Sequence, residues 1–220
     1  MRALTPLEAR VLGVLVEKAH TVPDTYPLSL NALVSGCNQK TAREPVMNVN
    51  EIEAQRALDD LRDLELVLER SGSRVVRYEH NMQRAMALPS QAVALIATLV
   101  LRGPQTSAEL RANSERLHRF GDLSSVDGFL QELSERAIEK GGPLVSRLPR
   151  APGSREARWV HLLCGEVDVS AMSATLGGHL PTHQEDLELI KQQQAHLQVE
   201  VIELRALVER LYTELGVHRG

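Results

Sequence analysis

Arginines are concentrated in two stretches of this 220-residue chain that repeat one another. Residues 72–80 have the sequence G-S-R-V-V-R-Y-E-H and residues 153–161 have G-S-R-E-A-R-W-V-H, so both follow the pattern G-S-R-x-x-R-aromatic-x-H. Guanidinium groups bind phosphate through charge-assisted hydrogen bonds, which makes clustered arginines candidates for nucleic-acid contacts. The predicted nucleic-acid-binding residues are the arginines in and near the two stretches: Arg70, Arg74, Arg77, Arg147, Arg150, Arg155 and Arg158.

A second candidate site is a polar loop that begins at Asn38. Its candidate ligand-binding side chains are those of Asn38, Gln39, Lys40 and Arg43, which suit a phosphate or a peptide carboxylate. The same side chains equally suit a structural role, in which they cap and cross-link the loop itself. The sequence leaves these two interpretations evenly balanced.

Motifs for catalysis and metal binding are not found in the sequence. It contains neither a phosphate-binding glycine loop of the G-x-x-x-x-G-K-[ST] or G-x-G-x-x-G type, nor H-E-x-x-H, nor C-x-x-C. His179 and His183 are four residues apart, but with Cys164 they form no convincing ligand cluster. We therefore expect no catalytic residues, no metal site and no cofactor, and predict that the protein is not an enzyme.

The composition is that of an ordinary globular chain. Hydrophobic residues make up 43% and charged residues 25%, with a formal net charge of -4, so a generically basic nucleic-acid coat protein is excluded. The longest apolar run, Ala92 to Leu101, is about half of the ~20 residues that a membrane helix needs. Two distant cysteines fit a reducing compartment. We expect a cytoplasmic protein with no membrane partner.

Three helix signals precede each arginine-rich stretch. Capping residues or apolar periodicity predict six helices, which start near Thr5, Ser29 and Asn50 in the first half and near Ser90, Thr106 and Ser125 in the second. Each arginine-rich stretch follows an apolar strand-like segment and is expected to form one arm of a β-hairpin. Three helices and a hairpin, twice, predict tandem winged-helix domains over residues 1–88 and 89–164. The alternative is a pair of small helical domains with incidental hairpins.

Strand alternation predicts which hairpin side chains are buried. It places Val76 and Tyr78, and in the second hairpin Ala157 and Trp159, on the inner face. The neighbouring arginines, at positions 77 and 158, are then expected to face solvent.

The C-terminal part has a different pattern. Residues 165–183 are rich in Gly, Ser and Thr and predict a flexible linker, and residues 184–216 predict a coiled-coil helix. The expected seam alternates steps of three and four: Leu187, Ile190, Gln194, Leu197, Val201, Leu204, Val208, Leu211 and Leu215. Such a seam favours a parallel homodimer, with a surface helix folded back onto the same chain as the alternative. The expected fold class is mainly α with small β-hairpins: tandem winged-helix domains followed by a C-terminal coiled coil.

The predicted third helix of each domain is acidic. Residues 50–65 contain six acidic residues against two arginines, and residues 125–140 contain four against two basic residues. In winged-helix proteins this helix commonly enters the major groove, where a negative charge repels phosphate. The basic hairpins are therefore the better candidates for DNA contacts.

Several segments together resemble the YceH-like family of uncharacterised bacterial proteins. The segments are L-T-P-L-E-A-R-V at 4–11, Y-P-L-S-L-N-A-L at 26–33, C-N-Q-K-T-A-R-E-P-V-M-N at 37–48, L-R-G-P-Q-T at 101–106 and E-L-R at 109–111. The resemblance extends over residues 4–165. It implies a cytosolic bacterial protein with two winged-helix domains, and it supplies no catalytic residues.

Two functions remain at this stage. The leading prediction is a dimeric regulator that binds duplex DNA through its basic hairpins. The alternative is a protein-interaction scaffold whose acidic third helices bind a basic protein partner without contacting DNA.

Overall fold

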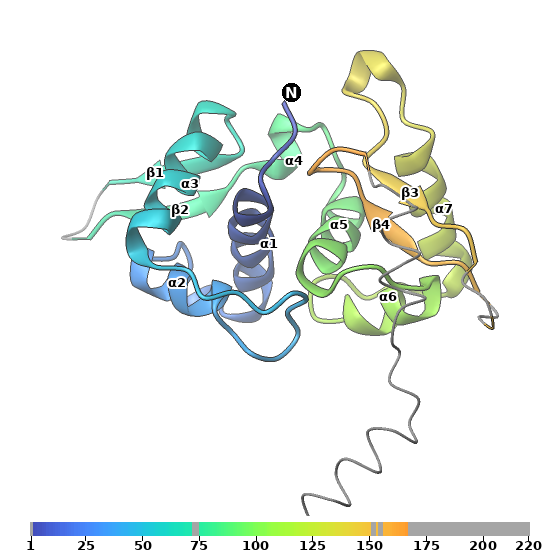
Figure 1. Cartoon of the computed structure of the whole chain (residues 1–220), viewed down its shortest axis with the longest axis horizontal. Coiled ribbons are helices and arrows are strands. Elements are labelled where there is room, and N and C mark those ends of the chain that lie inside the picture. Colours follow the sequence, from blue (N-terminus) through green and yellow to red (C-terminus); the bar gives the residue numbers. More distant parts are fainter. Residues whose placement is uncertain (1, 72–74, 151–152, 154–155, 167–220) are drawn as a thin grey trace, which may run out of the picture. The chain divides into compact units, whose positions relative to one another are not determined.

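The computed structural model describes residues 2–71, 75–150, 153 and 156–166. They belong to a compact unit, Met1–Val169, which is mainly helical and contains two small antiparallel hairpins (Figure 1). The mainly α fold class with small β-hairpins is thus confirmed. The predicted coiled-coil seam, all of the predicted linker beyond Glu166, and the arginines at positions 74 and 155 lie outside the described residues.

The first lobe opens with helices that start at the predicted caps. Helix α1 (Pro6–Thr21) begins with a reciprocal capping box between Thr5 and Glu8, and a short 3-10 helix, η1 (Pro23–Thr25), follows it. Helix α2 (Leu30–Cys37) is capped by Ser29. Helix α3 (Glu51–Asp63) has a second capping box, between Asn50 and Glu53. Each cap satisfies backbone N–H groups that a helix start leaves without intrahelical partners.

A hairpin closes the first lobe. Strands β1 (Val67–Arg70) and β2 (Arg77–His80) pair antiparallel with Val67 opposite His80. Tyr78 also pairs with Leu28, through N–H···O contacts of 3.0 and 2.8 Å, so the segment before α2 lies against the outer edge of β2. Tyr78 is buried as predicted. Val76 is 41% exposed, contrary to the prediction, because it lies before β2 begins and the alternation of the ladder does not extend to it.

The second lobe repeats this order after a short helix, α4 (Met82–Ala85). Helices α5 (Ser90–Arg102), α6 (Ser107–Asn113) and α7 (Leu123–Ser134) are followed by the 3-10 helix η2 (Ile138–Lys140) and by strands β3 (Val145–Arg147) and β4 (Trp159–His161). Helix α7 starts and ends earlier than predicted, because the carboxylate of Asp122 caps it and the chain leaves the helix after Ser134. Trp159 pairs with Gln105, as Tyr78 pairs with Leu28.

Helices α1 and α5 pack along each other at the centre of the unit, with the remaining elements of each lobe on either side (Figure 1). Their backbones approach closely at Gly13, where an added Cβ would lie 3.0 Å from Val100 Cγ1. One cluster of buried apolar side chains extends through both lobes. Backbone hydrogen bonds also join them, from Leu4 N to Leu163 O at 2.8 Å and from Glu44 N to Leu101 O at 2.7 Å. Among the described helices, none is both long enough and apolar enough to span a membrane.

Candidate nucleic-acid interface

The repeated arginine of each hairpin is bonded within its own lobe. Arg77 donates from Nη1 to the carbonyl oxygens of Thr25 and Pro27, at 3.0 and 2.7 Å. Arg158 donates to Pro104 O at 2.8 Å and to both carboxylate oxygens of Glu109, at 2.9 and 3.0 Å. The expectation that these two side chains simply face solvent is wrong, because strand alternation does not reveal the chain segment that lies against the hairpin edge.

The other described hairpin arginines differ in their surroundings. Arg70 forms an ion pair with Glu79, with 2.6 Å between Nη2 and Oε1, and this hydrogen bond raises the pKa of the exposed Arg70. Arg147 lies over the ring of Trp159, 5.8 Å from its centroid. Arg150 is exposed and has no hydrogen bond or ion pair with any described residue. Of the predicted hairpin contacts that the structure describes, Arg150 is therefore the most available for phosphate.

The polar loop of the first lobe is cross-linked from within. Asn38 donates from Nδ2 to Val49 O at 2.8 Å and accepts from Val49 N at 2.7 Å. Arg43 is buried and bonds Gly36 O at 3.1 Å, Gln39 Oε1 at 2.7 Å and both carboxylate oxygens of Glu17. These bonds favour the structural interpretation for Asn38, Gln39 and Arg43.

Lys40 differs from the other three loop residues. It is exposed and has no hydrogen bond or ion pair within the described part of the chain. It is thus the one of the four candidate ligand-binding side chains that is free to meet a ligand.

Burial affects the pKa values of three ionisable groups next to this loop: Glu17, Arg10 and Cys37. Burial raises the pKa of Glu17, but the hydrogen bonds and positive charges of Arg43 and Lys18 together outweigh it, so the carboxylate has a lowered pKa. Arg10 is also buried, which lowers its pKa; it donates to Pro45 O at 2.7 Å. Burial raises the pKa of the Cys37 thiol to about 12 despite both guanidinium groups, so this cysteine is a packing residue and not a reactive thiolate.

The second lobe has exposed cations that the sequence analysis did not single out. Arg116 and Arg119 lie between α6 and α7, are exposed, and make no hydrogen bond or ion pair with the residues that the structure describes. Arg111, on α6, donates to Gly121 O at 2.9 Å and remains exposed. Together these three arginines, which we call the α6–α7 arginine cluster, are accompanied by two acidic residues, Glu115 and Asp122. The spacing R-x4-R-x2-R before a helix cap is the signal that could have revealed them.

The start of α7 carries two exposed carboxylates, those of Asp122 and Asp127. The carboxylate of Asp122 accepts from the backbone N–H and the hydroxyl of Ser125, both at 2.7 Å, and Asp127 accepts from Ser107. The exposed acidic residues Glu132 and Glu135 lie in or just beyond the second half of the helix. These hydrogen bonds hold the carboxylates of Asp122 and Asp127 in place but do not remove their negative charge, so the positive charge of this region comes from the neighbouring arginines.

Helix α3 has the opposite character. Its exposed acidic side chains are distributed from its first residue to its last: Glu51, Glu53, Asp59, Asp60 and Asp63. Arg62 is neutralised by Asp59 and Glu69, at 3.3 and 2.8 Å. The second lobe is thus the electrostatically favourable one for a nucleic acid.

Within the described residues, no group of three or more His, Cys, Asp or Glu side chains is placed to hold a metal ion. His80 and His161 share the last position of the repeated pattern, and each has a buried Nδ1 without a hydrogen-bond partner. Burial lowers the pKa of each imidazole to about 4. The repeat thus places a half-buried histidine with a buried Nδ1 and a lowered pKa in both lobes.

Comparison with known proteins places the chain in a family. Residues 4–154 match the family described as "Protein of unknown function, DUF480". The chain belongs to this family. A UPF0502 protein from Burkholderia ambifaria is 61% identical over 219 residues, covering 99% of this chain and 91% of the relative. A UPF0502 protein from Leptothrix cholodnii is 60% identical over 222 residues, covering 99% and 97%. The chain is thus a DUF480 family member whose similarity to UPF0502 proteins covers 99% of its length.

Proposed function

We propose that this DUF480 protein is a cytoplasmic, non-enzymatic regulator that binds duplex DNA, and that its second lobe makes the principal contact. The observation that supports this most directly is the α6–α7 arginine cluster, which immediately precedes α7 along the chain. Exposed, unpaired guanidinium groups provide the phosphate contacts that position a protein on DNA.

The order of elements supports a winged-helix interpretation of both lobes. Each lobe has a helix, a short bridging segment, two further helices and a hairpin whose second strand pairs with the bridging segment. In helix-turn-helix proteins the second helix of the pair places its N-terminal residues in the major groove, while the preceding helix crosses the backbone. Helices α6 and α7 take these two roles in our proposal, with Ser124 and Ser125 nearest the base edges.

The hairpin contributes at its tip in this proposal. Arg150 provides a further phosphate contact, together with Arg155, whereas Arg158 keeps the hairpin attached to α6 through Glu109. In the first lobe, Arg77 has the same structural role, and the predicted contact Arg74 lies outside the described residues. A homodimer through the heptads of residues 184–216 would then present two copies of the second lobe to two half-sites.

The test is binding of a short fluorescein-labelled duplex of mixed sequence, followed by anisotropy over a salt series. We expect the R116E/R119E double variant to bind at least about tenfold more weakly at low salt, and its salt slope to fall by about two, because each lost phosphate contact removes about 0.9. The matched control is R56E, which reverses an exposed, unpaired arginine on α3. Equal binding by wild type and R116E/R119E, or an equal loss in R56E, would contradict the proposal.

One observation favours the scaffold function as a second candidate. Ile52, at the second position of the acidic α3, is 67% exposed, and Val46 in the preceding loop is 58% exposed. An apolar contact surrounded by carboxylates fits a basic protein partner. Capture of a partner that survives nuclease treatment and is lost in Ile52→Ser would support this candidate, and capture unchanged in Ile52→Ser would remove it.

A further inference from the structure

A cavity of about 380 Å³ lies where the start of the first lobe meets the end of the second. One wall is formed by Arg2 and Ala3, which precede α1, and by Ala85 and Met86 at the end of α4. The opposite wall consists of residues 136–144 after α7 and residues 162–165 after β4. A cavity of this size accommodates a small organic molecule.

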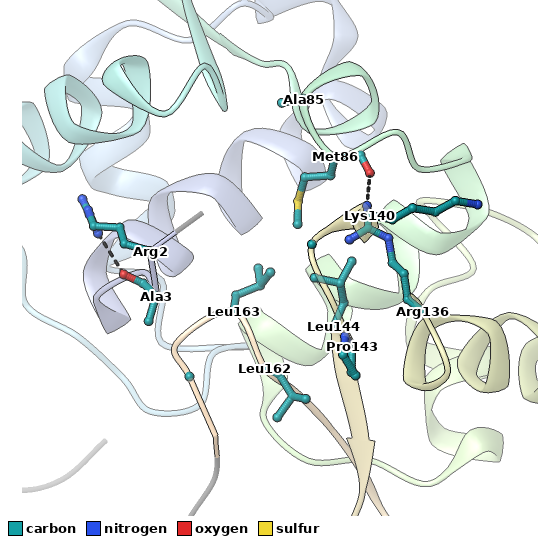
Figure 2. Close-up of a pocket in the computed structure, with 12 residues that line it drawn as sticks. Arg2, Ala3, Ala85, Met86, Arg136, Lys140, Pro143, Leu144, Leu162 and Leu163 are labelled. Atoms are coloured by element: carbon teal, nitrogen blue, oxygen red, sulfur yellow. Dashed lines mark hydrogen bonds between the residues drawn. The ribbon is translucent and has the colours of Figure 1, made fainter. Parts of the chain in front are cut away.

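The cavity combines an apolar centre with positively charged edges. Figure 2 shows Met86, Leu144 and Leu163 around the centre, with Arg2 at one edge and Arg136 and Lys140 at the other. None of the described residues that line it is acidic. An anion with an apolar body matches this lining, because its charge meets the cations while its carbon atoms leave water.

The three cations differ in how far they are already neutralised. Arg2 forms a bidentate pair with the carboxylate of Glu8, at 2.7 and 2.8 Å. Arg136 donates to Met86 O at 2.7 Å and has no carboxylate partner among the described residues (Figure 2). The side-chain ammonium of Lys140 has neither a hydrogen bond nor an ion pair with the described residues. The unbalanced positive charge thus lies at the edge formed by Arg136 and Lys140.

The backbone around Arg136 is shaped by two adjacent glycines. Gly141 and Gly142 have φ values of +99° and +77°, which side-chain-bearing residues rarely adopt. A Cβ at Gly141 would also lie 3.0 Å from Arg136 Nη1. The turn therefore leaves the guanidinium room at the cavity edge, while Leu144 N donates to Leu133 O at 3.0 Å and fixes the following strand.

A neighbouring cavity differs from this one in the charge of its lining. It measures about 500 Å³ and also contacts Arg136 and Lys140, but Glu132 and Glu135 line it as well. Those carboxylates lie in the lining itself and repel an anion there. The smaller cavity is thus the more favourable of the two for an anionic ligand.

We infer that this cavity between the lobes is a binding site for a small organic anion, specifically a monocarboxylate with an apolar body. Arg136 and Lys140 bind the carboxylate, and the side chains of Met86, Leu144 and Leu163 surround the body. Because the walls come from both lobes, a bound anion fastens the two together at this end. The residues that line this cavity do not include any of the α6–α7 arginine cluster, so anion binding here does not depend on DNA binding.

The test titrates the full-length, 15N-labelled protein with butanoate, hexanoate, octanoate and benzoate, while backbone amide resonances are followed. We expect saturable shifts at Gly141, Gly142 and Leu163. Hexanamide, which keeps the carbon chain but lacks the charge, should bind about tenfold more weakly, as is usual when a charged hydrogen-bond partner is lost. Inorganic phosphate, a charged group without an apolar body, should also bind more weakly than hexanoate.

Two variants locate the effect without removing a hydrogen bond that the fold uses. Lys140→Gln should weaken hexanoate about threefold, and Ala85→Phe, at an exposed position of the wall, should abolish binding by filling the cavity. Arg102→Gln, which removes an exposed cation of α5 outside this cavity, is the control and should leave affinity unchanged.

Four outcomes would overturn the inference: no member of the panel shifts these amides, hexanamide or phosphate binds as tightly as hexanoate, Lys140→Gln leaves the affinity unchanged, or the shifts persist in Ala85→Phe. Each is independent of the anisotropy result with the α6–α7 arginine cluster.

Discussion

The two lobes differ in the segment that joins their last two long helices, which runs from α2 to α3 in the first lobe and from α6 to α7 in the second. In the first lobe it contains Arg43, whose side chain is turned inward onto Glu17 and the loop's own backbone. In the second lobe it contains Arg116 and Arg119, which are exposed and unpaired among the described residues. An arginine in this connection is therefore a structural group in one lobe and an available surface charge in the other.

The hairpins, by contrast, are nearly equivalent. Arg77 and Arg158 bond the carbonyls of Pro27 and Pro104, and the aromatic residue that follows each pairs with the bridging segment. The repeated sequence pattern thus specifies a shared framework. The functional difference between the lobes arises on the surface that this framework presents.

The largest expected effect tests the buried arginine of the first lobe. Arg43→Met should cost about 3 kcal/mol of unfolding free energy, because it removes a buried ion pair and leaves the mostly buried Glu17 carboxylate with Lys18, at 3.2 Å, as its remaining cation. Urea denaturation measures this loss. The control is Arg119→Met, at an exposed position, which should change stability by no more than about 0.5 kcal/mol. If both variants cost the same, the contrast between the two connections would be wrong.

An intermediate effect concerns the buried histidines, for which the lobes should behave alike. Burial holds the pKa of His80 and of His161 at about 4, below the value of about 6.5 in an unfolded chain, so protonation favours unfolding. Stability should fall as pH decreases from 7 to 5, by up to about 2 kcal/mol for each histidine. Unfolding curves over this range provide the measurement.

The two single variants separate the contributions of the histidines. His80→Gln and His161→Gln should each remove a similar share of this pH dependence. The pKa values of Glu8 and Glu17 are already lowered, so these carboxylates lose their stabilising charge only at more acidic pH. An unaltered slope in both variants would show that neither imidazole is held neutral by the fold.

The smallest expected effect concerns the arginines that attach the hairpins. Arg77→Met and Arg158→Met should each cost about 1 kcal/mol, the usual net value of such hydrogen bonds. The additional ion pair of Arg158 with Glu109 is partly exposed at both ends, so it should add little. Thermal unfolding compares the two variants, with Arg150→Met as a silent control. A loss confined to one lobe would show that the two attachments are not equivalent.

Local signals predicted much of the fold and less of the candidate site. The caps at Thr5, Asn50 and Thr106 are formed by residues within three positions of one another, so sequence patterns suffice to locate those helix starts. The environment of Arg77 depends on Pro27, fifty positions away. No local pattern contains that information, and the prediction of a solvent-facing arginine failed for this reason.

The sequence by itself determined the repeated helix and hairpin order, the caps and the inward orientation of Tyr78 and Trp159, because periodicity and capping are properties of short segments. Only the tertiary structure decided which arginines are buried, which are bonded to neighbouring backbone and which remain exposed. It also formed the cavity between Arg2 and Arg136, since residues at the two ends of the described chain meet there. The physical reason is that the availability of a charge depends on what packs against it, and packing partners are set by the whole fold.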